Sequence, residues 1–138
     1  MRAGIDISRG WAMVALSGNG QGTRGSYRSK PLVEVSSMLE DKMWASGNWH
    51  LTRGKNAEFV QRWVEFLTWT KEANNGFLAA RLLGDSNDPD HFVSFASWRD
   101  AESMAAWKQR PEFAERFGNC RALCEDMQGG NFETVGAI

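Results

Sequence analysis

Two tryptophans nine residues apart, Trp98 and Trp107, are the side chains in this sequence best suited to bind a flat molecule. The segment from Gly76 to Pro111 predicts a strand, a polar turn, a second strand that ends at Trp98, and a helix that carries Trp107. Indole rings bury large flat surfaces, and these two can form walls of one pocket between a sheet and a helix. We therefore expect a small aromatic ligand, although both rings could also serve as core packing.

Such a pocket needs polar groups that hold the oxygens of its ligand and a group that accepts a proton. Asn48 and His50 alternate with Trp49 along a predicted strand, so they share one of its faces. If that face meets the helices, Asn48 is a hydrogen-bonding group and His50 is a candidate base. We predict that Trp98, Asn48 and His50 are catalytic, with a surface or structural role for His50 as the alternative.

Three further side chains are expected to contact a substrate. Arg81 lies in the strand before the one that ends at Trp98, where it can pair with a phenolate or form a salt bridge at the rim. Trp107 and Phe113 come from the helices that follow Trp98.

Motifs for bound cofactors and metals do not occur in the sequence. It has no Gly-rich phosphate loop, and two histidines are too few for a metal centre. Cys120 and Cys124 are four residues apart on one face of a predicted helix, which indicates buried thiols in a reducing compartment. We expect no cofactor, no metal and a cytoplasmic location.

The charge pattern argues against nucleic acid as a partner. The chain has 138 residues and a net charge of −1, and 24% of its residues are charged. Residues 1–37 carry five basic and two acidic side chains (+3), whereas residues 38–138 carry eleven and fifteen (−4). The acidic part is the one with the composition of a compact domain, which disfavours binding to phosphates. No apolar run approaches the length of a membrane span.

Hydrophobic periodicity and turn residues predict the elements that position these side chains. The expected elements are a strand at 46–53, a helix at 55–73, strands at 77–83 and 91–98, helices at 100–108 and 112–127, and a strand at 132–138. This β-α-β-β-α-β order is typical of the α+β ferredoxin-like fold, a four-stranded antiparallel sheet with the helices on one face. We expect residues 38–138 to form this domain. The Gly-rich residues 1–37 are predicted to be a flexible or non-native arm, or else an arm that docks on a partner.

The second face of the predicted sheet also needs a cover. Val93 and Phe95 alternate with Ser94 and Trp98, so they should point away from the helices. An apolar outer face in a chain of this size predicts a homodimer in which sheet packs against sheet.

Residues 45–138 resemble the antibiotic biosynthesis monooxygenase (ABM) family of the dimeric α+β barrel superfamily. The resemblance rests on the order and spacing of short motifs: Gly54, Glu58-Phe59, Gly76-Phe77, Ser97-Trp98, Ala101-Glu102 and Ala106-Trp107. It implies a dimeric barrel with one pocket per subunit between sheet and helices. It also implies oxidation of an aromatic quinol, phenol or anthrone by O2 without metal or flavin.

Two branches of that family are matched only in part. Trp98 corresponds to the pocket tryptophan of the anthrone-oxidising branch, but the asparagine of that branch four residues earlier is Ser94 here. A serine hydroxyl can still donate one hydrogen bond to a substrate oxygen, so the resemblance implies that Ser94 contacts the substrate. Trp107 corresponds to a tryptophan of the haem-degrading branch, whose histidine ligand nine residues later is Arg116 here. Arginine stays protonated and is no ordinary haem ligand, so haem degradation ranks third. The leading expectation is a cofactor-independent monooxygenase, and the alternative is a non-catalytic dimeric domain that binds an aromatic metabolite.

Overall fold

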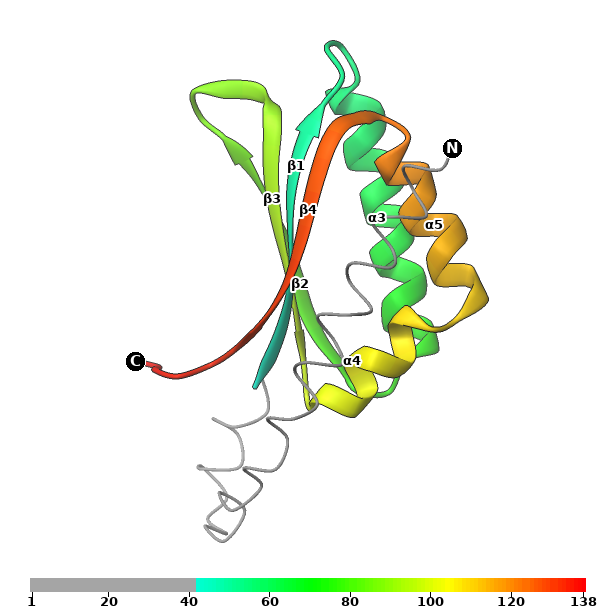
Figure 1. Ribbon diagram of the computed structural model, residues 1–138, viewed down its shortest axis with the longest axis vertical. Coiled ribbons are helices and arrows are strands. Elements are labelled where there is room, and N and C mark those ends of the chain that lie inside the picture. The colour runs from blue at the N-terminus through cyan, green and yellow to red at the C-terminus, as the bar shows by residue number, and fades with distance from the viewer. Residues whose placement is uncertain (1–41) are drawn as a thin grey trace, which may run out of the picture.

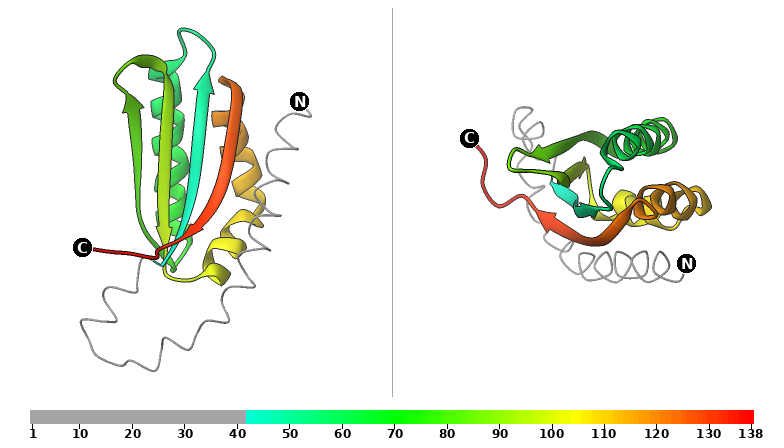
Figure 2. Two further views of the ribbon diagram at one scale, coloured as in Figure 1. Left: turned by 60° about the vertical axis from the view of Figure 1, so that its left-hand side comes forward. Right: turned by 90° about the horizontal axis from the view of Figure 1, so that it is seen from above.

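A computed structural model describes residues 42–138, and in it a four-stranded antiparallel sheet carries three helices on one face (Figures 1 and 2). The elements in chain order are β1 (Met43–Leu51), α3 (Asn56–Ala73), β2 (Phe77–Asp85), β3 (Asp88–Trp98), α4 (Ala101–Lys108), α5 (Pro111–Arg121) and β4 (Cys124–Glu133). The strands lie in the order β2-β3-β1-β4. The predicted α+β ferredoxin-like fold is therefore confirmed, while the predicted arm at 1–37 lies outside the described residues.

Local sequence explains where the helices begin and end. The turn before α3 contains Gly54 at φ +82°, a conformation that other residues rarely adopt. Helix α4 begins after Asp100, whose carboxylate accepts a hydrogen bond from the backbone N–H of Ser103 at 2.8 Å. Helix α5 begins at Pro111, which fits the first turn because a proline needs no hydrogen-bonded N–H there.

The C-terminal part of the prediction was wrong in its boundaries. Helix α5 ends at Arg121 rather than residue 127, and β4 covers the residues that were assigned to the end of that helix. The register between β1 and β4 shifts after His50, which adds one residue to β4 between Cys124 and Asp126. Cys124 and Met127 therefore both face the core, with the three-residue spacing that resembles a helix.

Two other strand ends also differ from the expectation. Strand β1 occupies 43–51 rather than 46–53, and β3 begins at Asp88, so the turn after β2 contains only residues 86 and 87. The carboxylate of Asp85 accepts a hydrogen bond from the Asn87 N–H at 2.9 Å, which stabilises this short turn. Gly129 and Gly130 do not break an element but lie inside β4, opposite Gly47 and Ser46 of β1.

The hydrophobic core fills the space between the sheet and the helices. Its largest side chains are aromatic and almost fully buried: Trp49, Phe59, Phe66, Trp98, Trp107, Phe113 and Phe117. The opposite, outer face of the sheet has no layer over it among the described elements (Figure 1). Leu83, Phe95 and Phe132 lie there with 49%, 37% and 57% of their surface exposed. None of the helices between residues 42 and 138 is both long and apolar enough to cross a membrane.

Candidate functional site

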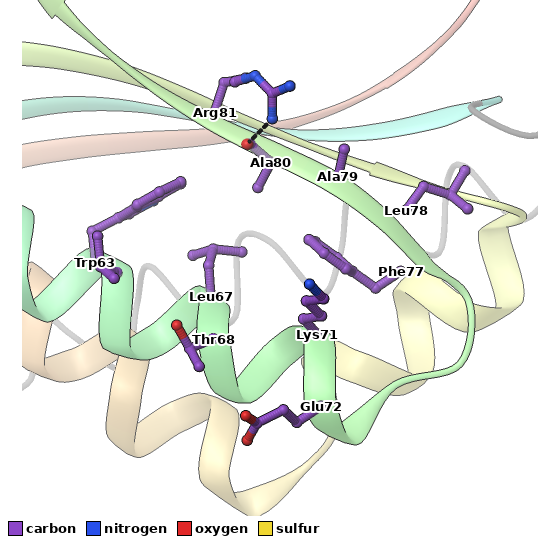
Figure 3. A pocket seen from close by; sticks show the side chains of 11 residues that line it. Trp63, Leu67, Thr68, Lys71, Glu72, Phe77, Leu78, Ala79, Ala80 and Arg81 are labelled. Carbon is purple, nitrogen blue, oxygen red and sulfur yellow. Dashed lines mark hydrogen bonds between the residues drawn. The ribbon is translucent and has the colours of Figure 1, made fainter.

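An open groove of about 500 Å³ runs between helix α3 and strand β2 (Figure 3). Its lining residues come from these two elements: Trp63, Val64, Leu67, Thr68, Lys71 and Glu72 of α3, and residues 77–81 of β2. Strand β2 is an edge strand of the sheet, so no further strand from residues 42–138 covers this side. The volume lies in the range of pockets that bind small organic molecules.

Helical spacing forms one wall of the groove. Trp63, Leu67 and Lys71 follow one another at intervals of four residues, so they share one face of α3. Figure 3 shows all three rising toward β2, while Phe77 and Ala80 point from β2 back toward the helix. The groove therefore has an apolar floor with a cationic side chain at one end.

A bulge in β2 forms the opposite wall. The register between β2 and β3 shifts between Phe77 and Ala79, so Phe77 faces the helices whereas Ala79 and Arg81 face the other side. Figure 3 shows Arg81 beyond the strand, where its Nη1 donates a hydrogen bond to the carbonyl of Ala80 at 2.8 Å. Arg81, a predicted substrate contact, thus lies at the rim rather than inside the groove.

Behind the groove the core contains a void of only about 10 Å³. Trp63 and Leu67 line both spaces, so they form the partition between the groove and the interior. Trp49, Ser94 and Trp107 also line the void. A space of this size is at the lower limit for one water molecule, so this void has no room for a ligand in this conformation.

Ser94 is buried next to this void, with 6% of its surface exposed. Its Oγ accepts a hydrogen bond from Trp49 Nε1 at 2.9 Å. The hydroxyl hydrogen of Ser94 is still available as a donor, because a serine can accept and donate at the same time. The Ser94 side chain therefore combines burial with one remaining donor.

Trp98 lies fully buried at the end of β3, behind Phe77 of the groove. Its ring centroid is 5.6 Å from that of Phe77 and 4.8 Å from that of Trp107. The two indoles therefore contact each other directly. Trp98 Nε1 is buried without a hydrogen-bond partner among residues 42–138, whereas Trp107 Nε1 donates to Thr70 Oγ1 at 2.9 Å. A buried N–H left unpaired is costly, and Trp98 Nε1 shares this state with nitrogens of Arg116, Arg121 and Asn131 among the described residues.

The structure places Asn48 and His50 away from Trp98 and Ser94. Trp49 is fully buried toward the helices, and its neighbours Asn48 and His50 consequently lie on the outer face of the sheet. Alternation alone allowed Asn48 and His50 to lie on either face of the sheet. The large apolar side chain of Trp49 between them was the signal that the opposite face of this strand is the buried one. The three predicted catalytic residues are therefore not brought together within one chain.

A histidine that was not among the predicted site residues, His91, contacts both Asn48 and His50. His91 lies opposite His50 in the β1–β3 register, and their rings stack at 4.5 Å. His91 Nε2 is 2.6 Å from Asn48 Oδ1, and His91 Nδ1 is 2.7 Å from Asp85 Oδ2. The hydrogen bond from His91 is the main cause that lowers the pKa of Asp85, followed by the backbone N–H of Asn87. This polar cluster becomes visible only when the strand register is known.

Phe113 is part of the aromatic core rather than the groove. Its ring lies 4.8 Å from Trp107 and 5.5 Å from Phe66, with 1% of its surface exposed. Phe113 therefore supports the ring that in turn contacts Trp98. Arg116, at the position discussed for a haem ligand, lies 5.6 Å over the ring of Trp69 instead.

Comparisons with known proteins agree with this architecture. The crystal structure of SnoaB, a cofactor-independent oxygenase from Streptomyces nogalater, superimposes with a TM-score of 0.65 at 20% identity. The match covers 71% of this chain and 97% of SnoaB. A putative antibiotic biosynthesis monooxygenase from Deinococcus radiodurans matches with a TM-score of 0.61 at 18% identity, over 70% of this chain and 95% of the other.

Similarity to solved structures at this level of identity establishes the fold and leaves the activity open. No curated protein matches the sequence. The model of the antibiotic biosynthesis monooxygenase family, however, matches residues 46–117, which is just over half of the chain. The protein therefore belongs to the antibiotic biosynthesis monooxygenase family.

Proposed function

We propose that the protein is a cofactor-independent monooxygenase that oxidises an aromatic quinol, phenol or anthrone with O2. The observation that carries the proposal is the buried N–H of Trp98, which has no partner among the described residues. A substrate oxygen that accepts this hydrogen bond would satisfy it, and the bond strengthens as negative charge develops on that oxygen. Family membership and the fold shared with SnoaB support the same chemistry.

The reaction requires a substrate that can form an electron-rich anion. In an anthrone, the CH2 carbon between the rings loses a proton, and the resulting anion transfers electrons to O2. One oxygen atom becomes the new carbonyl oxygen, and the other leaves as water together with the two hydrogens of the carbon. The protein binds the ring, excludes water and stabilises the anion, so no bound redox group is needed in this scheme.

The groove between α3 and β2 is the proposed path to Trp98. The substrate ring lies on Trp63 and Leu67, and rotation of the Phe77 side chain exposes the indole behind it. Ser94 supplies a second donor through its hydroxyl hydrogen once the Trp63 partition opens. Trp107 and Phe113 hold the Trp98 ring in place, and the proposal uses neither Asn48 nor His50.

Self-association through the outer face of the sheet is part of the proposal. Leu83, Phe95 and Phe132 leave large apolar side chains exposed on that face, and a second copy of the chain would cover them. Analytical ultracentrifugation should show a dimer at micromolar concentration. The Phe95→Glu variant should shift the population toward monomer while it retains its circular dichroism spectrum. A wild-type protein that stays monomeric would contradict this part.

Oxygen uptake by metal-free, flavin-free protein tests the activity. A panel of quinols and anthrones is measured with autoxidation subtracted, and Trp98→Phe is compared with Trp69→Phe. Trp69 lies on α3 against Arg116, away from the groove lining, so it controls for the loss of an indole. Saturable uptake that only Trp98→Phe loses supports the proposal. Tryptophan quenching by the same ligands without uptake would favour the non-catalytic binding domain instead.

A further inference from the structure

Lys71 is the charged side chain that faces the groove. Figure 3 shows its ammonium group rising from α3 toward β2, next to Phe77, while the carboxylate of Glu72 points away from the strand. The third charged lining residue, Arg81, lies on the other side of β2 with its guanidinium on the Ala80 carbonyl. The described lining residues therefore present a net positive charge to a molecule inside the groove.

The apolar side chains around Lys71 strengthen its attraction for an anion. Leu67 and Trp63 lie one and two turns before Lys71 on the same face of α3, and Phe77 lies across the groove. A ring that rests on this floor therefore ends beside the ammonium group. The neighbouring apolar surface lowers the local dielectric constant, so an ion pair there is screened less than one on an open surface.

The carbonyl groups at the end of helix α3 leave the ammonium group of Lys71 available to a ligand. Lys71 lies in the last turn, where free carbonyl groups attract cations. Two of these carbonyls are already occupied: that of Thr70 accepts from Asn74 Nδ2 at 2.8 Å, and that of Ala73 accepts from Arg110 Nη2 at 2.8 Å. Among residues 42–138, Lys71 forms no ion pair with a carboxylate.

We propose that the groove selects aromatic substrates that carry a carboxylate, and that Lys71 is the residue that determines this specificity. Its ammonium binds the carboxylate at the end of the groove, while Trp63, Leu67 and Phe77 contact the ring. The inference rests on the proposed function in that it takes this groove as the substrate site. It adds the substrate class and a residue that selects it.

A matched pair of ligands tests the inference with the full-chain protein. The pair is 2-naphthol and 6-hydroxy-2-naphthoic acid, which share a ring system and a hydroxyl group and differ in the carboxylate. Dissociation constants are measured by tryptophan quenching at pH 7 for the wild type, Lys71→Gln, Lys71→Arg and the control Lys55→Gln. Lys55 precedes the same helix and does not line the groove. Each variant is first checked for unchanged thermal unfolding.

The expected preference of the wild type for the acid is about fivefold, the upper end for a partly exposed ion pair. Lys71→Gln should abolish the preference without weakening 2-naphthol, whereas Lys71→Arg and Lys55→Gln should retain it. Salt at about 0.5 M should reduce the wild-type preference.

Equal affinity for both ligands in the wild type, or a preference that survives in Lys71→Gln, overturns the inference. So does failure of both ligands to bind. A different result would overturn the proposed function, because that proposal requires oxygen uptake that depends on Trp98. The proposed function is unaffected if 2-naphthol and 6-hydroxy-2-naphthoic acid bind equally well.

Discussion

Replacement of Trp98 by phenylalanine should separate stability from function. The variant removes the indole N–H, which is buried and has no partner among the described residues. Removal of such a group recovers part of a cost of about 1–3 kcal/mol. The smaller ring leaves a cavity on the order of 40 Å³, which costs roughly 1 kcal/mol at about 24 cal/mol per Å³. The two effects oppose each other, so the free energy of unfolding should change by no more than about 1 kcal/mol.

The matched variant Trp107→Phe should be less stable. It leaves a similar cavity, and it also breaks the hydrogen bond of 2.9 Å to Thr70 Oγ1. A hydrogen bond of this kind contributes about 1 kcal/mol, so the expected loss is about 2 kcal/mol. Guanidinium denaturation followed by circular dichroism measures both values, because a single domain of this size usually unfolds in two states.

The two variants should rank in the opposite order when their activity is measured. A hydrogen bond to an oxygen that gains negative charge contributes about 1.5–3 kcal/mol, so Trp98→Phe should lower kcat/KM for oxygen uptake at least tenfold. Trp107→Phe retains the Trp98 N–H and should lose less. The reasoning is refuted if Trp98→Phe loses as much stability as Trp107→Phe, or if it retains full turnover.

Three further predictions concern the polar and thiol groups. Ser94→Ala leaves a buried indole N–H without its acceptor and should cost about 1–3 kcal/mol in denaturant unfolding; an unchanged midpoint would contradict the hydrogen bond. The pKa of Asp85 is lowered from 3.8, first by His91, so its stabilisation is present above that value and is lost as the pH falls below it. Asp85→Asn should therefore flatten the acid side of a plot of Tm against pH, whereas an identical acid limb would exclude the role. Burial raises the pKa of Cys124 to about 12 and that of Cys120 further, so iodoacetamide at pH 8 should label both thiols only in denaturant. Rapid labelling of the native protein would show that the thiols are exposed.

The element order was predictable because each periodic pattern was long enough to be distinctive. The stripe of Phe59, Trp63 and Phe66 in α3 and the proline that begins α5 determine the helices without tertiary information. The end of α5 was not predictable, since the extra residue in β4 gives Cys124 and Met127 the spacing of a helix. A bulge depends on how two strands pair, and the sequence of one strand does not show it.

The arrangement of the candidate site was also predictable only in part. The burial of Trp98 and Trp107 and their mutual contact follow from their positions at the end of β3 and in α4. The positions of Phe77 and Arg81 on opposite sides of β2 depend on a second bulge, so the sequence left Arg81 open between a phenolate contact and a salt bridge at the rim, and it did not select Phe77. The contact between His50 and His91 depends on the β1–β3 register, which alternation within one strand does not fix.

The nitrogen–hydrogen NMR resonance of the Trp98 indole tests the central claim most directly. The protein is labelled with ¹⁵N, the resonance is assigned from its absence in Trp98→Phe, and a quinol that supports oxygen uptake is added. The indoles of Trp49 and Trp107 serve as internal references because both already donate hydrogen bonds inside the core. The account predicts a saturable downfield shift of the Trp98 resonance that exceeds the shifts of the other two. A ligand that binds and leaves the Trp98 resonance in place would contradict it.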